Sequence, residues 1–354
     1  MIKTNNSLYK NLLTNLFAIA RETNDPILLM GKPGVGKTRI AKMIHKQWEK
    51  KQSKTNSPFK ELNCATLNNS QLILSELFGH KKGAFTGAIT DHDGLIKSAN
   101  NGTLFLDEIG DLDLYSQAKL LKTLEHGEYL PLGSNQIEKS NFRLICATNK
   151  KLEQEIANNN FREDLYSRLR NWVFRLPSLK ELPEDIELYI NEKLDEWNKT
   201  EKKSVVFAKN AFDIFLNFAL SDEATWTANF RDVKRSINRM AWLASIKDLG
   251  GTNKITKKIV ELEIKNLKDI WNRTFENELS DDYSYNQLKH IALRKNLPLA
   301  YIAEQYLIDA AIADCKGKKA AAKLLYGDCL SNPSSKINDR IKFLRKKFNQ
   351  NINL

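Results

Sequence analysis

The 354 residues suffice for two or three domains, and a hydrophobic content of 42% allows a sizeable core and excludes wholesale disorder. No stretch approaches 18 apolar residues and residues 1–20 lack a secretory signal, so we expect a cytoplasmic protein with no membrane span; the four cysteines, which lack metal-ligand spacing, fit reduced thiols there. The net charge is +12, of which residues 315–348 alone carry +8, so the basic end indicates either a polyanion partner or a solvated lysine-rich surface.

The first half of the chain alternates helical and strand patterns. Helical apolar spacing occurs at 7–20, 39–51 and 115–125. Short apolar runs typical of buried parallel strands occur at 26–31, 103–108 and 142–149. Strands that alternate with helices predict an α/β domain, a parallel sheet flanked by helices, which we place at residues 1–180.

The second half reads as helical. Four helical stretches occur at 184–199, 208–220, 231–246 and 255–267, and they predict an all-helical lid over residues 181–267. Residues 268–298 are polar and predict a linker. A small, basic helical domain is expected at 299–354.

The segment GKPGVGKT at 31–38 fits the phosphate-binding loop pattern and lies between a predicted strand and a predicted helix. Its glycines allow a tight turn whose N–H groups face phosphate, Lys37 would reach the β- and γ-phosphates, and Thr38 would hold Mg²⁺. The candidate nucleotide-binding residues here are Gly31, Gly34, Val35, Gly36, Lys37, Thr38 and Arg39.

The strand TLFLDE at 103–108 delivers two adjacent carboxylates at its carboxyl end. Asp107 would hold Mg²⁺ through water, and Glu108 would polarise the attacking water. Such a strand end is a weak signal alone, but together with the phosphate-binding loop it predicts nucleotide hydrolysis.

Two further groups are candidates for the same chemistry. Asn149 ends the predicted strand at 142–149 and either orients the attacking water, senses the γ-phosphate, or merely caps the strand. Arg162 and Arg168 lie six residues apart in FREDLYSRLR (161–170), and either enter a neighbouring subunit's site or are solvated on the surface.

The segment GAFTGA lies between the two nucleotide motifs. Two glycines flank a Phe–Thr pair at a predicted loop tip, which favours a mobile loop with an exposed aromatic anchor; the alternative is an ordinary turn with a buried Phe85. Its residues are Gly83, Ala84, Phe85, Thr86, Gly87 and Ala88.

In this order and spacing, these segments resemble the sigma-54 activators, or bacterial enhancer-binding proteins, of the AAA+ class over roughly residues 5–250. The resemblance implies an AAA+ P-loop ATPase that uses ATP and Mg²⁺ and assembles as a homo-oligomeric ring, a hexamer by analogy. In that family the GAFTGA loop rises on ATP binding and contacts sigma-54, so Phe85 and Thr86 would contact sigma-54 RNA polymerase here.

The same resemblance assigns further positions. LNCATL (62–67) places Asn63 where the family has a switch residue that restrains the catalytic glutamate, and PLGSNQIEKS (131–140) matches a second pore-side loop. NFRDV (229–233) matches the lid motif in which an arginine, Arg231 here, senses nucleotide. This chain has Ala228 where the family has glycine.

A narrower resemblance, at 224–244 and 334–348, is to the RtcR-type activators of RNA-repair operons. Those regulators carry an N-terminal sensor domain of the CARF type, whereas the ATPase pattern here begins near residue 1. We therefore expect a separate sensor protein, a lost sensor, or a free-standing activator.

The basic end predicts contact with DNA, which for an activator would be an upstream activating sequence. The predicted helix at 336–348 could face phosphate or a major groove, although the turn at 327–335 is longer than in an ordinary helix-turn-helix. The alternative is a basic bundle that packs on the ATPase. The candidate DNA-binding residues are Lys336, Arg340, Lys342, Arg345 and Lys346.

Together these features predict an ATPase that converts the closed sigma-54 promoter complex to the open complex. Two other hypotheses about the function compete with this one. One is an AAA+ remodeller of a mobile-element or defence system that acts on another nucleic-acid or protein target; the other is a nucleotide-dependent DNA-binding scaffold, which would not need the second acid, Glu108.

Overall fold

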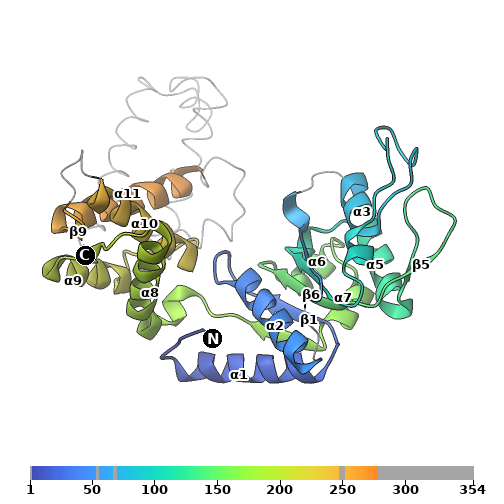
Figure 1. Ribbon diagram of the computed structural model, residues 1–354, viewed down its shortest axis with the longest axis horizontal. Helices are drawn as coiled ribbons and strands as arrows, with labels where there is room; N and C mark the ends of the chain where they lie inside the picture. Colours follow the sequence, from blue (N-terminus) through green and yellow to red (C-terminus); the bar gives the residue numbers. More distant parts are fainter. Residues whose placement is uncertain (1, 53–55, 67–69, 247–251, 278–354) are drawn as a thin grey trace, which may run out of the picture. The chain divides into compact units, whose positions relative to one another are not determined.

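A computed structural model (Figure 1) describes residues 2–52, 56–66, 70–246 and 252–277. The chain divides into two units, Met1–Ile264 and Lys265–Leu354, and the candidate site lies in the first. Within the described ranges, no helix is long and apolar enough to span a membrane.

A five-stranded parallel sheet forms the centre of the first unit, in the order β2-β3-β6-β1-β7. The strands are β1 (Ile27–Met30), β2 (Phe59–Asn63), β3 (Thr103–Asp107), β6 (Arg143–Thr148) and β7 (Trp172–Arg175). The central strands β1 and β6 are buried along their whole length, which explains their continuous apolar sequences. The register pairs Asn63 with Asp107 and thereby brings the ends of β2 and β3 together.

Helices cover both faces of the sheet, and alternate strand residues supply the two cores. Ile27 and Leu29 pack with residues of α1 (Ser7–Glu22) and α2 (Lys37–Lys51). Leu28 packs in the other core, with residues of α3 (Ser70–Phe78), α5 (Leu114–His126), α6 (Leu152–Ala157) and α7 (Glu163–Leu169). The remaining short elements of this half are α4 (Leu95–Ser98), the antiparallel pair β4 (Glu128–Tyr129) and β5 (Glu138–Lys139), and the 3₁₀ turns η1 (Cys64–Thr66), η2 (Ile109–Asp111) and η3 (Leu179–Glu181).

The predicted α/β fold with a helical lid is confirmed. The sheet ends at Arg175, and the lid helices follow as α8 (Pro183–Glu201), α9 (Lys209–Leu220), α10 (Phe230–Ser245) and α11 (Lys257–Asn277). The lid also contains one feature that the sequence did not predict, the parallel pair β8 (Val206–Phe207) and β9 (Lys254–Ile255), because two-residue strands have no readable periodicity. Helix α11 ends at Asn277, so the first part of the predicted linker is helical and the rest lies outside the described residues.

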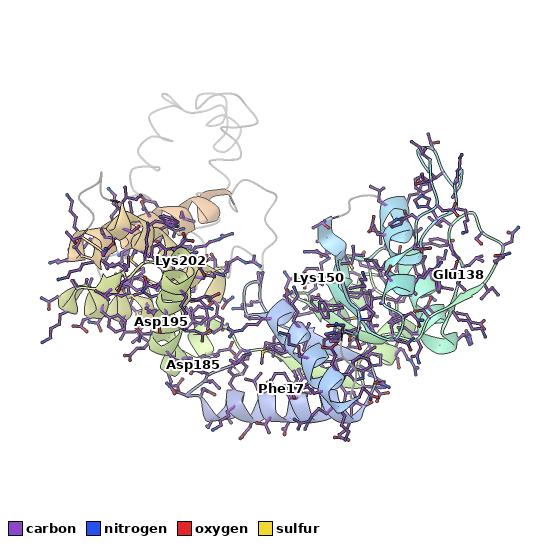
Figure 2. The ribbon with its side chains drawn as sticks, viewed as in Figure 1. Phe17, Glu138, Lys150, Asp185, Asp195 and Lys202 are labelled. Carbon is purple, nitrogen blue, oxygen red and sulfur yellow. The ribbon has the colours of Figure 1, made fainter. Side chains whose placement is uncertain are left out.

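The N-terminal segment is tied to the lid. Asp185, at the start of α8 and labelled in Figure 2, accepts hydrogen bonds from the Thr4 hydroxyl at 2.5 Å and from the Asn5 backbone N–H at 2.6 Å. Asn6 then caps α1 by accepting from the Tyr9 N–H. These bonds hold residues 2–6 along the edge of the site.

Candidate nucleotide site and partner loops

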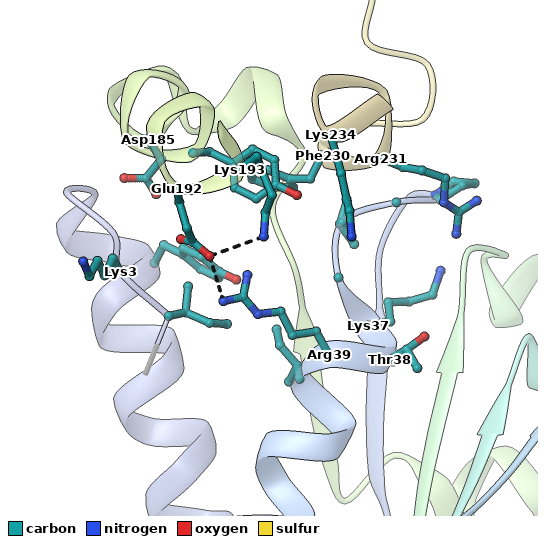
Figure 3. A pocket seen from close by; sticks show the side chains of 18 of the residues that line it. Lys3, Lys37, Thr38, Arg39, Asp185, Glu192, Lys193, Phe230, Arg231 and Lys234 are labelled. Carbon is teal, nitrogen blue, oxygen red and sulfur yellow. Dashed lines mark hydrogen bonds and ion pairs between the residues drawn. The ribbon is translucent and has the colours of Figure 1, made fainter. Parts of the chain in front are cut away.

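A cleft of about 790 Å³ opens where the phosphate-binding loop, the end of β3 and the lid helices α8 and α10 meet (Figure 3). Its lining includes Lys37, Thr38, Asp107, Glu108 and Arg231, which the sequence places at widely separated positions. The structure therefore brings the two nucleotide motifs and the lid arginine into one site.

The glycines of the loop are needed for its shape. Gly34 and Gly36 have φ of +78° and +99°, a conformation that favours glycine. A Cβ on Gly34 would also lie 1.9 Å from the carbonyl oxygen of Ala228, so the lid packs directly on the loop. Helix α2 begins at Lys37, and its N-terminal N–H groups open onto the cleft, as an anion-binding site requires.

Lys37 and Thr38 connect the loop to the acidic end of β3. The buried Lys37 ammonium donates to the Gly31 carbonyl at 2.9 Å and lies 3.3 Å from Glu108 Oε1. Thr38 Oγ1 lies 3.4 Å from Asp107 Oδ2. A hydroxyl and a carboxylate at this spacing fit Mg²⁺, which takes one or two protein oxygens and completes its shell with phosphate and water.

Glu108 is held in a strained and well-defined position. Its backbone is left-handed, with φ +51°, and its N–H donates to Asp107 Oδ1 at 3.1 Å. Its carboxylate accepts from the Lys37 ammonium and, at 3.0 Å, from the backbone N–H of Asn149. The carboxylate therefore projects toward the phosphate-binding loop from a backbone position that is held in place.

The two candidate asparagines are placed differently. Asn63 lines the cleft, and its side-chain oxygen accepts from the Ala65 N–H at 2.9 Å. Asn149 bonds Glu108 through its backbone rather than its side-chain amide, and its side chain is exposed. In this structure Lys37 and the Asn149 N–H bind the glutamate, and the switch role of Asn63 stays a prediction.

Cys64 lies beside the acidic end of β3, but its thiol is expected to be unreactive. Burial, with smaller contributions from Asp111, Asp107 and Glu108, raises the pKa of the Cys64 thiol to about 12. Because the thiolate is the reactive form, the protonated thiol serves as packing.

The turn before α10 joins the lid to the phosphate-binding loop. Buried Asn229 accepts from the Leu179 N–H and donates to the Pro33 carbonyl, both at 2.9 Å. Asn229 itself has a positive φ of +51°, and Ala228 is accommodated with its N–H bonded to Asp232 Oδ2 at 2.8 Å. The alanine that departs from the family pattern is thus compatible with this turn.

The sequence reasoning missed the part of the cleft that is formed by α8 and the N-terminal segment. Glu192 of α8 forms ion pairs with Arg39 at 3.2 Å and with the buried Lys193 at 3.4 Å (Figure 3). Lys193 also contacts Glu196 and lies 5.1 Å from the centre of the Tyr189 ring. Burial raises the pKa of Tyr189. The amphipathic pattern of α8 signals a buried face but does not show that this face covers a nucleotide loop. The missed lining residues include Ile2, Lys3, Tyr9, Asp185, Leu188, Tyr189, Glu192, Lys193, Glu196, Phe230 and Lys234.

Arg162 and Arg168 lie on the exposed side of α7 and outside the lining of the cleft. The Arg162 guanidinium pairs with Asp164 at 2.7 Å, which raises the pKa of the arginine. Arg168 donates to the Leu124 carbonyl at 3.4 Å. Both side chains are thus accessible to a second molecule.

The GAFTGA loop closes on itself through Gly83 N–H to Ala88 O, at 2.8 Å, between glycines of positive φ. Thr86 is exposed, as expected, but Phe85 is half-buried with its ring edge-on to His80, 5.0 Å between centres. The most exposed apolar side chain here is instead Ile89, which is 78% accessible. The motif ends at residue 88, so sequence reasoning passed over Ile89.

The base of this loop is bonded to the second loop. Lys81 N–H donates to Leu132 O at 2.9 Å, and Leu132 N–H donates to Gly79 O at 3.0 Å. Gly133 lies so close to Ala84 that a Cβ on the glycine would be 2.7 Å from the alanine Cβ. The two loops therefore share one base. The candidate DNA-binding residues Lys336, Arg340, Lys342, Arg345 and Lys346 lie outside the described residues.

Parts of this chain are similar in sequence to known proteins. Residues 2–175 match the family described as the Sigma-54 interaction domain. The chain is 40% identical over 272 residues to the transcriptional regulatory protein RtcR of Escherichia coli (strain K12), which covers 76% of this chain and 49% of that protein. It is 40% identical over 227 residues to a Nif-specific regulatory protein of Rhizobium etli, covering 64% of this chain and 37% of that protein. The chain thus spans about half the length, or less, of these relatives.

Solved structures give the same fold. NtrX from Brucella abortus in complex with ATP superposes with a TM-score of 0.61 at 22% identity, covering 97% of this chain and 69% of that one. The NtrX complex with ADP gives a TM-score of 0.62 at 24% identity and covers 97% and 70%.

Proposed function

Since residues 2–175 of this chain belong to the sigma-54 interaction domain family, we propose that the protein is an ATP-hydrolysing activator of sigma-54-dependent transcription. Its work is the conversion of the closed complex of sigma-54 RNA polymerase into the open complex. The observation that carries the proposal is the GAFTGA loop at 83–88, which lies in the same domain as a complete nucleotide site.

Nucleotide hydrolysis follows from the geometry of the cleft. Lys37 would leave Glu108 for the β- and γ-phosphates, and Glu108, still bound by the Asn149 N–H, would polarise the attacking water. Thr38 and Asp107 would hold Mg²⁺, which when bound neutralises charge on the phosphates. Arg231 reaches the cleft from the lid, where it would sense the nucleotide.

Assembly completes the site. Arg162 and Arg168 are exposed and lie outside their own cleft, so they would act on the nucleotide of a neighbouring subunit in a ring, which we propose to be a hexamer. A cation that enters a water-poor site at the γ-phosphate stabilises charge in the transition state.

Coupling to the polymerase would use the shared base of the two loops. When the GAFTGA loop rises, Phe85 leaves its contact with His80 and joins the exposed Thr86 on sigma-54. Asn63, which pairs in register with Asp107, would report the state of Glu108.

The proposal extends to the target genes and to the DNA site. The RtcR relative at 40% identity supports an RNA-repair operon as the target, and the basic stretch 315–348 supports binding to an upstream DNA site. The competing function is an AAA+ remodeller with another target.

The test is promoter opening with purified components. Sigma-54 RNA polymerase, a sigma-54 promoter and this protein are combined, and unpaired promoter thymines are detected by permanganate. We expect opening with ATP and none with Lys37→Ala. Robust ATP hydrolysis by an assembled ring without any opening would instead favour the competing remodeller.

A further inference from the structure

Gln117, in the first turn of α5, is a fully buried polar side chain that bonds three backbone groups, one nearby in the preceding turn and two more than 40 residues away in sequence. Its Nε2 donates to the Leu112 carbonyl at 2.6 Å and to the Asn160 carbonyl at 3.0 Å. Its Oε1 accepts from the Arg162 backbone N–H at 2.8 Å. Both donors and the oxygen of this amide are therefore in use, and its loss would leave buried polar groups unpaired.

The three partners belong to two functional segments. Leu112 closes the η2 turn, which begins directly after Glu108. Asn160 lies in the turn between α6 and α7, and Arg162 is the N-cap of α7, the helix that carries Arg168. Helices α5 and α7 lie side by side (Figure 1), so Gln117 joins the turn that follows Glu108 to the start of α7, the helix that carries Arg168.

We propose that Gln117 is the positioning residue that sets the start of α7, and with it Arg162 and Arg168, for donation to the neighbouring subunit. This inference rests on the proposed function of those arginines. Helix α7 spans only Glu163–Leu169, and a helix this short depends on tertiary contacts for its position.

The contacts indicate that the arginines, rather than Glu108, depend on Gln117. Glu108 has its own donors in Lys37 and the Asn149 N–H, and these bonds do not pass through Gln117. In contrast, the Arg162 side chain is exposed and pairs with Asp164 of its own helix, so its aim follows the backbone that Gln117 holds. A misplacement of about 1 Å at such a group costs about 100-fold in rate.

The variant Gln117→Met removes both donors and the acceptor at similar side-chain length. We expect kcat for ATP hydrolysis to fall about 10- to 100-fold. The affinity for ADP is expected to change less than about threefold, because nucleotide binding uses other residues. Gln154→Met, the same substitution at an exposed site on α6, is the matched control and is expected to retain the wild-type rate.

Mixed rings separate a defect in the arginines from a defect at Glu108. A Gln117→Met subunit has a functional Glu108 but donates misplaced arginines, whereas a Glu108→Gln subunit donates correctly placed arginines. Mixing the two proteins is therefore expected to restore hydrolysis above the level of either protein alone. Mixing it with the Arg162→Ala, Arg168→Ala double variant is expected to restore nothing. The reverse pattern would place the action of Gln117 at Glu108 and overturn the inference, and so would an unchanged kcat in Gln117→Met.

One mixture tests the underlying proposal separately. Glu108→Gln and the double arginine variant must restore activity together; if they do not, the arginines are not donated between subunits. Ring size and the thermal unfolding midpoint are measured for each protein. If Gln117→Met fails to fold, Gln117→Ala, which also removes the acceptor for the Arg162 N–H and leaves room for water at the unpaired groups, takes its place in the same mixtures with the same expected pattern.

Discussion

At the scale of single residues, Glu108 is the residue on which hydrolysis depends in this account. Its strained backbone and two donors keep the carboxylate in one place. We expect Glu108→Gln to lower kcat for ATP hydrolysis by about 10²–10⁴-fold with nucleotide binding retained, because an amide cannot act as a base toward water. Steady-state hydrolysis and ADP binding measure the two effects, and exposed Glu125→Gln on α5 is the control. Hydrolysis that survives in Glu108→Gln would move the role of base to another group.

His45 predicts a dependence of stability on pH. This residue is buried on α2, with Nδ1 at 2.9 Å from the Thr103 hydroxyl, and burial lowers its pKa against an opposing effect of Glu49. The His45 imidazole is therefore protonated near pH 6.5 in the unfolded chain but only at lower pH in the folded chain. The stability of the fold accordingly falls as the pH drops through about 6.5. The loss is at most about 1.4 kcal/mol per pH unit.

Denaturant unfolding between about pH 7.5 and pH 5 tests this expectation around the ordinary histidine pKa. His45→Asn keeps a polar atom near Thr103 and cannot titrate, so its pH dependence should be flatter than that of the wild type. His126→Asn, at an exposed site, should retain the wild-type dependence. Equal slopes in all three proteins would contradict a role for His45.

The structure brings the nucleotide-site candidates Lys37, Thr38, Asp107, Glu108 and Arg231 into one cleft, whereas the surroundings of the cleft were not predicted from the sequence. The phosphate-binding loop and the Asp107–Glu108 pair are each formed by consecutive residues. The geometry of each segment is local, so spacing alone indicates their roles. Arg143, the largest fully buried side chain, could not be foreseen: it donates to the Ala20 carbonyl at 2.5 Å, and burial lowers its pKa to about 10. Only the packing of α1 against the sheet reveals such a site.

At the scale of elements, the shared base of the two loops is the feature that would transmit nucleotide state to the polymerase. Gly133→Ala forces the second loop away from Ala84, whereas Gly127→Ala introduces the same left-handed strain with its nearest contact at an ordinary 3.6 Å. Both variants should lose about 1–2 kcal/mol of stability. Only Gly133→Ala should also weaken nucleotide-dependent sigma-54 binding, by about tenfold, as an overpacked contact does.

Binding of labelled sigma-54 and denaturant unfolding, measured on both glycine variants, distinguish strain from steric conflict. Equal loss of sigma-54 binding in the two variants would mean that the contact between the loops is not specific. ATP hydrolysis is measured as well and should be retained in both.

The sequence also predicts elements unevenly. The longer helices α1, α2, α5 and α8 to α11 and the three central strands have strong apolar patterns and were found, but the short helices α3, α4, α6 and α7 and the edge strands β2 and β7 were not. The residues of β7 alternate between half-buried and exposed positions, and β2 is mostly half-buried and carries Lys60 and Glu61, so both edge strands lack the apolar run that identifies a central strand. Their existence follows from the completed sheet rather than from their own residues.

At the scale of the whole molecule, the charge distribution predicts how the proposed binding to DNA would depend on salt. Residues 315–348 carry most of the net charge, so each phosphate contact that they supply should add to the salt dependence of binding. Lys342→Ala should reduce the slope of log K against log salt by about 1, with ATP hydrolysis unchanged. Lys10→Ala, on the exposed face of α1, should leave the slope as it is. An unchanged slope in Lys342→Ala would favour a basic bundle without DNA contact.

The proposed coupling runs from nucleotide state to sigma-54 through the GAFTGA loop, and binding of sigma-54 in the presence of a trapped nucleotide tests this coupling. The wild-type protein and Thr86→Ala are each incubated with sigma-54 and ADP–aluminium fluoride, which mimics the transferring phosphate, and complex formation is measured. We expect a complex with the wild type that requires the trapped nucleotide and is lost in Thr86→Ala, although both proteins hydrolyse ATP. The absence of any complex with an assembled, hydrolysing wild type, or an equal complex with Thr86→Ala, would contradict the account.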